Sequence, residues 1–362
     1  MKSRAMVLEK FNHPLVLRNF DIPNLPEGAI LVKLLASGVC GSDLHMAKGE
    51  DPRTPLPIIL GHEGVGQVVQ INGEKCDLNG KKIKTGDWII WNRGIVCNNC
   101  FWCKVSRQPY LCPNRKVYGI NLSCKDYPYL LGAYSEYMVL FRETEILKIP
   151  QIDPVCLVTA ACSGATAMHA FDLISEPLLS KTVVIQGAGP LGVFCVVAAR
   201  TLGASQVIMI SGSQQRLELA KKAGADIVLN RHDINEEERT KKILSITGNR
   251  GADIVIEASG NSKALLEGFR LVRRGGMYMI TGVAVPQESI PLDVYHDLVF
   301  KNIHIQGVWV SDAKHLVQAV DLIAKHPEIF ERIVTHRLPL SQANEALKLI
   351  EERTALKVAI TF

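Results

Sequence analysis

A strand, a glycine-rich turn and a helix are expected in succession near the middle of the chain. Residues 182–186 are apolar and rich in β-branched side chains, and an apolar helix is expected to reach about Leu202. The turn between them reads Gly187-Ala-Gly189-Pro190-Leu191-Gly192. Its glycines allow a tight bend and let a pyrophosphate approach the helix N-terminus, where free N–H groups and the helix dipole favour anions. Because the motif lies between a strand and a helix, it predicts a dinucleotide-binding site.

Strands and helices alternate beyond this turn. The pattern predicts strands at 206–210, 226–229, 253–257 and 277–281, and amphipathic helices at 214–223, 235–247 and 262–272. Such alternation is typical of a doubly wound parallel sheet with helices on both faces. The segment therefore predicts a Rossmann domain.

The end of the second strand of this domain bears on the choice of dinucleotide. An acidic residue there usually binds the adenosine ribose hydroxyls and selects NAD. Here the sequence is Ser211-Gly-Ser213-Gln-Gln-Arg216, without a carboxylate. The two serines could donate to a 2′-phosphate and Arg216 could pair with it, although Arg216 also fits an ordinary solvated helix position. The sequence favours NADP and leaves dual use open.

The first 150 residues have a different character. Short apolar segments such as 29–36, 64–71 and 87–91 are separated by Gly, Pro, Asn and Asp, as in β-rich domains with functional loops. A chain of 362 residues is also longer than one hydrophobic core usually supports. Two domains are therefore expected, with a β-rich part preceding the Rossmann domain.

A histidine beside a carboxylate, His62-Glu63, follows Cys40 in this β-rich part. Cysteine, histidine and carboxylate are ligands that zinc can use, and Asp43 could orient His62 from behind. A helix is expected just after Cys40, with Ser42 or Asp43 as its N-cap. Cys40 alone, or His62 alone, would more often be an ordinary core side chain. The two together predict a metal site.

Four further cysteines, Cys97, Cys100, Cys103 and Cys112, fall close together. Short Cys-x-x-Cys steps let successive thiolates bind one tetrahedral ion, and a closed four-thiolate site leaves no position for substrate. The run therefore predicts a structural zinc. Cys124 nearby is given no role.

Composition limits the classes of function. The net charge of +5 is modest and is not concentrated in a long basic run, which disfavours nucleic acid as a partner. Charged residues interrupt the first twenty positions, and no apolar run reaches the length of a membrane span. Ten cysteines without a secretory signal are better read as thiols and metal ligands than as disulfides. A cytoplasmic location is expected.

The segments Cys40-Gly-Ser-Asp-Leu-His45 and Gly61-His-Glu-Gly-Val-Gly66 resemble the zinc-dependent alcohol dehydrogenases of the medium-chain dehydrogenase/reductase superfamily. The resemblance runs to the end of the chain. It implies a GroES-like catalytic domain at residues 1–160 and 306–362, with a structural zinc lobe at about 95–115, and a Rossmann domain at 161–305. In the family the cysteine lobe usually has seven residues before its last cysteine, whereas eight separate Cys103 from Cys112 here.

The resemblance also implies residue roles. Cys40, His62 and Cys162 would bind the catalytic zinc, with Glu63 a mobile neighbour that can exchange onto the ion. Cys156 is the rival of Cys162, but the Ser-Gly-Ala-Thr that follows Cys162 fits the family better. Ser42 and His45 would relay the proton of the substrate. Lys357 would contact a phosphate of the cofactor. The nicotinamide amide would lie near the backbone around Gly282, Val283 and Val308.

Together these parts predict reversible oxidation of a primary or secondary alcohol, or polyol, to an aldehyde or ketone. The family alignment puts Trp91, Asn92 and Arg93 at the wall of the substrate pocket. An inward Arg93 would suggest a carboxylate, phosphonate or sulfonate on the substrate, and an outward Arg93 would be solvated. The domains are expected to meet with the zinc facing the nicotinamide.

Three alternatives remain open. A zinc ribbon at 97–112 could present a nucleic-acid or protein surface, a zinc-free quinone or enone reductase could share the superfamily fold, and a cofactor-binding sensor could lack turnover. The resembled family forms dimers or tetramers, and an apolar strand expected at 302–310 could join Rossmann sheets edge to edge.

Overall fold

The computed structural model describes residues 2–362, which form two compact units. Unit 1 comprises 1–165 and 311–362, and unit 2 comprises 166–310. The chain thus leaves unit 1 for an inserted unit and returns to it. The division falls at 165 and 310, whereas the sequence placed it at 160 and 305.

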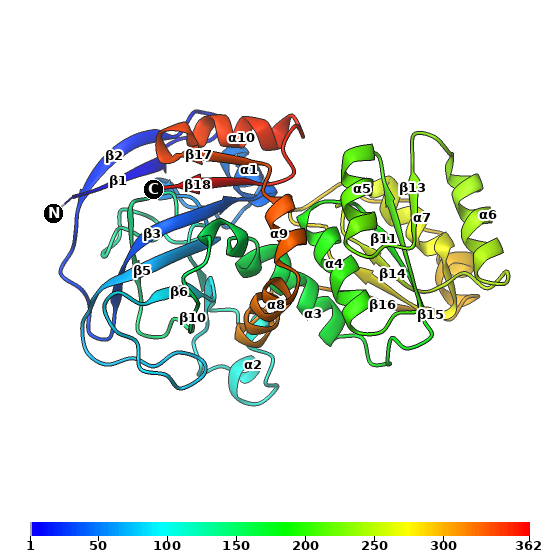
Figure 1. The fold of residues 1–362 in the computed structure, drawn as a ribbon, viewed down its shortest axis with the longest axis horizontal. Coiled ribbons are helices and arrows are strands. Elements are labelled where there is room, and N and C mark those ends of the chain that lie inside the picture. Colours follow the sequence, from blue (N-terminus) through cyan, green and yellow to red (C-terminus); the bar gives the residue numbers. More distant parts are fainter. Residues whose placement is uncertain (1) are drawn as a thin grey trace. The chain divides into compact units, whose positions relative to one another are not determined.

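Unit 1 is built on sheets whose strand pairs are antiparallel except for the parallel pair β17–β18 (Figure 1). Its main sheet has seven strands in the order β10-β6-β5-β3-β18-β17, with β9 also pairing with β3. A second sheet has the order β2-β1-β4, and β7 pairs with β8. The strands are β1 (Lys2–Leu8), β2 (Val16–Asp21), β3 (Ile30–Val39), β4 (Ile58–Ile59), β5 (Gly64–Ile71), β6 (Trp88–Trp91), β7 (Gly94–Ile95), β8 (Lys116–Val117), β9 (Tyr137–Leu140), β10 (Ile146–Lys148), β17 (His336–Pro339) and β18 (Val358–Thr361).

The long strand β3 organises this unit because three neighbours pair with it. It is antiparallel to β5, β9 and β18, so the last strand of the chain is brought beside one of the first. Eight of its ten residues are buried. The ends of β3 and β18 are consequently fixed by pairing on several sides, and the residues just beyond them are held in place.

Helices and turns cover the sheets of unit 1. Apolar residues recur every three to four positions in α8 and α10, and these helices bury that side. The helical elements are α1 (Gly41–Lys48), α2 (Phe101–Lys104), α8 (Ala313–Lys325), α9 (Pro327–Ile333) and α10 (Ala343–Glu351), with single turns at Pro109–Leu111, Pro154–Leu157 and Leu340–Gln342 and a π-helical turn at Ala160–Gly164. The sequence did not predict α9, whose seven residues follow α8 almost directly.

Unit 2 is a six-stranded parallel sheet in the order β13-β12-β11-β14-β15-β16. Since β11 is its first strand, this is the doubly wound order in which strand order reverses beside β11. The strands are β11 (Thr182–Gln186), β12 (Gln206–Ser211), β13 (Ile227–Asn230), β14 (Ala252–Glu257), β15 (Val272–Ile280) and β16 (His304–Gly307). The parallel sheet predicted from the sequence is confirmed.

Helices lie on both faces of this sheet, as Figure 1 shows. Helices α4 and α5 pack together against β11 and β12, while α6 and α7 pack together on the other face. The helices are α3 (Ala165–Asp172), α4 (Pro190–Thr201), α5 (Gln214–Lys222), α6 (Glu236–Ile246) and α7 (Ser262–Leu271), with a π-helical turn at Val294–Val299. Side-chain caps from Ser213, Asn235 and Asn261 begin three of them.

One helical stretch, Pro154–Asp172, is long and apolar enough to cross a membrane by length and composition alone. Within the fold 78% of it is buried, as expected of a core segment. It contains Cys162, one of the predicted zinc ligands.

Candidate active site and metal centres

Four metal-binding side chains from separate parts of unit 1 converge at one point. Ligand atoms of Cys40, His62, Glu63 and Cys162 all lie within 4.8 Å of one another. Cys40 follows β3, the His-Glu pair precedes β5, and Cys162 lies in the π-helical turn. Such π-turns inside helices occur frequently at functional sites. The rival Cys156 is buried elsewhere in the core and is not in this group.

The donor set fits a zinc ion. The Cys40 and Cys162 sulfurs are 4.0 Å apart, close to the separation of about 3.8 Å that tetrahedral Zn–S bonds of about 2.3 Å require. His62 is buried, and its Nε2 has no hydrogen-bond partner in the protein. A buried nitrogen without a partner is costly unless it binds something. These three ligands would leave one position of a tetrahedral ion open.

Asp43 fixes the geometry around His62. Its Oδ1 lies 3.3 Å from His62 Nδ1, and its carboxylate accepts hydrogen bonds from the backbone of Cys40 (2.8 Å) and Gly61 (3.3 Å) and from the Tyr134 hydroxyl (3.1 Å). A carboxylate at Nδ1 directs Nε2 to the metal. Asp43 thus lies against His62 Nδ1 at ion-pair distance, without a hydrogen bond between them, and its orienting role stays a prediction. The predicted N-cap is wrong, because α1 begins after Cys40 and Asp43 lies inside its first turn.

Glu63 is held by a lysine that the sequence assigned elsewhere. Lys357 Nζ forms an ion pair with Glu63 Oε2, and both side chains are buried. In this structure Lys357 is engaged with Glu63, and its predicted contact with cofactor phosphate stays a prediction. Because Lys357 precedes β18, which pairs with the end of β3, its side chain is brought to the buried zinc site. Gly38 on β3 makes room, since a Cβ there would lie 2.0 Å from Glu63 Oε2.

Neighbouring groups bias Cys40 toward the thiolate form that metals bind, whereas the hydrogen bond with Cys40, together with burial, raises the pKa of Cys162 well above its usual range. The Cys162 thiol, and to a smaller extent His62 and Lys357, lower the pKa of Cys40 well below its usual range, against the effect of burial. Although burial opposes it, Asp43 and Cys40 raise the pKa of His62 to about 9. Burial and Cys40 raise the pKa of Glu63, while Lys357 opposes them. The metal-free site thus concentrates unpaired donors and charge.

The two predicted relay residues lie on α1. Ser42 Oγ is 3.7 Å from Cys40 Sγ, so the hydroxyl borders the metal-binding group. His45 is one turn further along, partly exposed, with its Nδ1 2.5 Å from Glu50 Oε2. The sequence did not single out Glu50. The structure therefore places one relay residue at the metal and the other at the surface.

The two predicted pocket-wall residues have different environments. Trp91 is 2% exposed and belongs to the core cluster of unit 1, packed over Gly64. Its assignment to the substrate is therefore wrong, because alternation along β6 directs it, like Ile89, to the core face. Arg93 is 6% exposed, so the outward alternative is wrong as well. Although burial opposes it, the thiols of Cys162 and Cys40 raise the pKa of Arg93, which places its guanidinium beside the zinc site.

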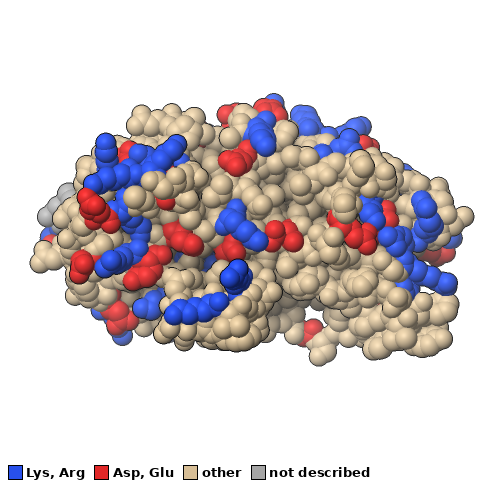
Figure 2. Space-filling view, turned by 90° about the horizontal axis from the view of Figure 1, so that it is seen from below, with Lys and Arg blue, Asp and Glu red and all other residues tan. Residues whose placement is uncertain are grey.

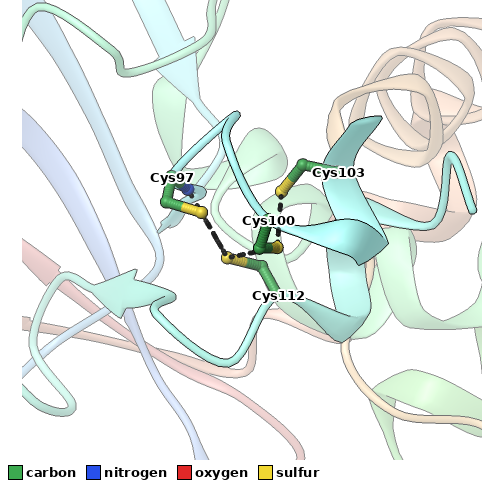
Figure 3. Close-up of side chains that lie close together, drawn as sticks. All are labelled: Cys97, Cys100, Cys103 and Cys112. Carbon is green, nitrogen blue, oxygen red and sulfur yellow. Dashed lines mark hydrogen bonds between the residues drawn. The ribbon is translucent and has the colours of Figure 1, made fainter. Parts of the chain in front are cut away.

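The second predicted metal site is assembled in the 97–112 lobe (Figure 3). Sulfur–sulfur distances are 3.5 Å for Cys97–Cys112, 3.5 Å for Cys100–Cys103 and 3.9 Å for Cys100–Cys112. These values fit four thiolates around one zinc. The backbone of Asn99 contributes most to lowering the pKa of Cys97 to about 6. Between Cys103 and Cys112 the chain passes through a loop in which Arg107 has a φ of +55°.

The glycine motif of unit 2 has the geometry that its sequence predicts. Gly187 has a φ of +105° and follows β11, and a Cβ on Gly192 would lie 1.8 Å from the Gly187 carbonyl oxygen. Gly189 is the N-cap of α4, followed by Pro190 and Leu191, and the space beside it is open. Backbone N–H groups at this helix start are available to a pyrophosphate.

The other predicted cofactor residues lie at the same carboxyl edge of the sheet. Ser211 ends β12 and Ser213 caps α5, where its Oγ accepts from the backbone of Arg216 (3.5 Å). Val283 follows β15, and Val308 follows β16 and donates to the Ile280 carbonyl (2.9 Å). In a parallel doubly wound sheet this edge binds the ligand.

Two basic residues that were not predicted from the sequence lie beside the end of β12. A Cβ on Gly212 would lie 2.5 Å from Arg231 Nε and 2.6 Å from His232 Nε2. The backbone of Arg231 donates to the Ser211 carbonyl (2.9 Å). Both residues follow β13, and only the pairing of β13 with β12 brings them here.

Comparisons with known proteins agree with this geometry. A family model described as alcohol dehydrogenase GroES-like domain matches residues 26–151, and one described as zinc-binding dehydrogenase matches residues 190–325. The chain is 31% identical to a 5-exo-hydroxycamphor dehydrogenase of Pseudomonas putida, over 99% of this chain and 98% of that protein.

Solved structures show the same fold. An alcohol dehydrogenase from Thermotoga maritima is 57% identical with a TM-score of 0.97, covering 100% of this chain and 99% of the other. A zinc-binding dehydrogenase from Sinorhizobium meliloti, bound to NADP, is 28% identical with a TM-score of 0.86 over both full chains. The GroES-like and Rossmann domains, zinc and NAD(P) predicted from the sequence are thereby confirmed. The chain belongs to the zinc-dependent alcohol dehydrogenases of the medium-chain dehydrogenase/reductase superfamily.

Proposed function

We propose that this enzyme oxidises a primary or secondary alcohol, or polyol, at a zinc ion held by Cys40, His62 and Cys162, with NADP as the favoured hydride acceptor. The observation that carries the assignment is the convergence of these ligands in a buried site. The chain would hold a second, structural zinc with the cysteines of the 97–112 lobe.

Each cofactor supplies one kind of chemistry. A zinc ion with an open position eases loss of the alcohol proton, and the nicotinamide accepts the hydride. The protein must then carry the proton to solvent. Ser42 is placed to accept it beside the metal ligands, and His45, exposed and paired with Glu50, is placed to release it. Substrate and cofactor hydroxyls would complete the relay between them.

Glu63 has a positioning role in this scheme. With Oε2 paired to Lys357 and Oε1 without a hydrogen-bond partner, the carboxylate lies within reach of the metal-binding atoms but is anchored away from them. By pairing with Glu63, Lys357 would leave a coordination position of the bound ion to substrate. Glu63 acts as a neighbour of the ion rather than as a permanent ligand.

The preference for NADP is supported by the basic residues around the end of β12. Ser211 and Ser213 offer hydroxyls, and Arg231 and His232 lie against Gly212. A 2′-phosphate would meet the Arg231 cation there instead of the carboxylate that selects NAD. We expect Arg231→Ala to raise KM for NADP about 10-fold while changing KM for NAD less than about twofold. Equal effects on both cofactors, or none, would refute this preference.

The activity is tested with a panel of alcohols and polyols, each offered with NAD and with NADP, by following reduced nicotinamide by absorbance. Zinc-loaded enzyme is expected to turn over at least one alcohol, and Cys162→Ser to abolish turnover. Cys156→Ser, which removes the rival thiol, is the matched control and should remain active. If Cys156→Ser is inactive and Cys162→Ser is active, the ligand assignment is wrong.

The other readings account for less of the chain. A quinone or enone reductase has no use for two assembled zinc sites, and a sensor has no use for a hydroxyl and histidine relay beside one of them. A nucleic-acid ribbon would need a continuous basic surface, whereas basic and acidic side chains are interspersed on the face seen in Figure 2. These features support a small-molecule substrate without nucleic acid or membrane partners, in the reducing cytoplasm.

The edge of the Rossmann sheet supports self-association. Strand β16 pairs only with β15, and its Ile305 is exposed. An exposed edge strand with free backbone N–H and C=O groups is a template for a second copy of the same chain. We infer a homodimer, or a homotetramer built from it, to be tested by light scattering during gel filtration. A monomer at micromolar concentration would contradict this.

A further inference from the structure

Two arginine side chains lie together beside the candidate zinc site. Arg93 directly precedes β7, and Arg115 directly precedes β8, which pairs with β7. Gly94 makes this possible, because a Cβ there would lie 2.1 Å from Arg115 Nε. The glycine after Arg93 therefore admits a second guanidinium against the backbone of the first.

Neither arginine forms an ion pair with a carboxylate, although the thiols of Cys162 and Cys40 support the charge of Arg93, and the more distant Asp312 and Glu145 support that of Arg115. Within residues 2–362, no carboxylate lies at ion-pair distance from either guanidinium. Arg93 Nε and Arg115 Nε and Nη1 are buried without a hydrogen-bond partner, and Arg115 Nη2 donates to the backbone oxygen of Ser311 (2.9 Å). Burial, together with repulsion by Arg93, lowers the pKa of Arg115 to about 10. Buried cations are costly unless they are paired.

The charges of the loaded zinc site do not supply the missing anion. The Cys40 and Cys162 thiolates would balance the zinc ion, and Glu63 is paired with Lys357. The other carboxylate of this site, Asp43, already receives hydrogen bonds from two backbone N–H groups and the Tyr134 hydroxyl and contacts His62. Arg93 and Arg115 are therefore both left without a carboxylate partner, and Arg93 is the one beside the metal-binding thiols.

We propose that the alcohol substrate carries an oxyanion, a carboxylate or a phosphate ester, and that Arg93 binds it while Arg115 strengthens the field. This inference rests on the function proposed above. A guanidinium presents a planar fork of N–H donors that matches a carboxylate in bidentate fashion, which favours hydroxy acids within this class. Neutral alcohols would leave the fork unpaired and would bind less well.

The test compares substrates that share one polyol chain: sorbitol, gluconate and sorbitol 6-phosphate. In the wild type, kcat/KM for one of the two anions should exceed that for sorbitol at least about 10-fold. Arg93→Met should lower that anion's value about 100-fold and change the sorbitol value less than about threefold. Arg93→Lys should recover part of the loss. Arg332→Ala, which removes an exposed arginine of unit 1, is the charge-matched control and should leave all values unchanged.

Several outcomes would overturn the inference. If the wild type shows no preference for either anion, or if Arg93→Met slows all substrates equally, Arg93 serves the zinc ligands and not the substrate. Zinc content and melting temperature of the variants show whether the fold is intact. A higher kcat/KM for gluconate would indicate that the site recognises a carboxylate, and a higher value for sorbitol 6-phosphate would indicate that it recognises a phosphate.

A binding measurement separates this inference from the proposed function. Calorimetric titration of zinc-loaded wild type with gluconate and with sorbitol 6-phosphate should detect binding of at least one that Arg93→Met weakens about 100-fold. If no alcohol is turned over but this binding is found, the anion site stands and the proposed function fails. If alcohols are turned over but neither anion binds better than sorbitol, the anion site fails and the function stands.

Discussion

Removing the lysine of the buried Glu63–Lys357 pair should destabilise unit 1 strongly. Glu63 is fully buried and Lys357 is 2% exposed. Since Glu63 Oε1 has no other partner, Lys357→Met would leave a buried carboxylate uncompensated. Breaking such a pair costs about 3–5 kcal/mol.

That cost corresponds to a measurable change in melting temperature. At about 2.1 cal/mol/K per residue, a unit of about 200 residues has an unfolding entropy of about 0.4 kcal/mol/K. Lys357→Met should therefore lower the melting temperature of unit 1 by about 7–12 °C. Scanning calorimetry on protein verified to contain two zinc ions per chain is the assay. The exposed Lys82, paired with Glu74, provides the control, and Lys82→Met should melt like the wild type.

The double variant decides whether the pair is the cause. Glu63→Gln should also destabilise, by leaving a buried ammonium, but Lys357→Met combined with Glu63→Gln should lose much less than the sum of the two. A coupling of at least about 2 kcal/mol is expected. Strictly additive changes would refute the reasoning, since each side chain would then act through other contacts.

Three further results are expected. Cys112→Ser should release one zinc per chain and lower the melting temperature, whereas Cys124→Ser should keep both ions; equal zinc content in the two variants would contradict the four-thiolate site. His45→Ala should lower kcat about 10-fold, and added imidazole should restore part of it, as for a lost proton carrier; no rescue would exclude the relay. Despite opposing burial, the backbone N–H of Thr182 and the Arg273 side chain lower the pKa of Asp253 below its usual value. This carboxylate therefore stabilises the fold above that usual value and loses its contribution as pH falls through the lowered one. Asp253→Asn should accordingly flatten the fall in melting temperature below about pH 4, and an unchanged slope would show that Asp253 is not responsible.

The parts of the fold that depend on local patterns were predictable from the sequence. The alternation of strands and helices in unit 2 and the glycine turn depend on patterns in consecutive residues. Their positions were therefore predicted to within a few residues, except that β15 begins earlier than predicted. The zinc site of the 97–112 lobe was predicted in the same way, because its cysteines from Cys97 to Cys112 are closely spaced in the sequence. Such features need no knowledge of which strand pairs with which.

Features that depend on strand pairing were not predictable. Lys357 reaches Glu63 because β18 pairs with β3, and Arg231 reaches Gly212 because β13 pairs with β12. Trp91 was misplaced because a family alignment gives a position but not the face of the strand. One signal was available: Gly38 interrupts an apolar strand, and a glycine there often marks a close approach by another group.

Arg93 shows the limit most clearly. The sequence presents an arginine after an apolar strand and cannot say whether it is solvated or buried. Its burial follows from the fold around β7 and β8, and its lack of a counter-ion from the positions of every carboxylate in the unit. Only the folded structure shows that Arg93 is buried without a carboxylate partner, and this is why we infer an anionic substrate.

Zinc content per chain tests the central claim most directly. Wild-type enzyme, measured by atomic emission after removal of loosely bound metal, should contain two zinc ions. Cys40→Ser and His62→Ala should each retain one, and Glu63→Ala should retain both, because Glu63 lies beside the ion without being needed to hold it. A variant of Glu63 that loses one zinc, or a variant of Cys40 or His62 that keeps two, would contradict the site described.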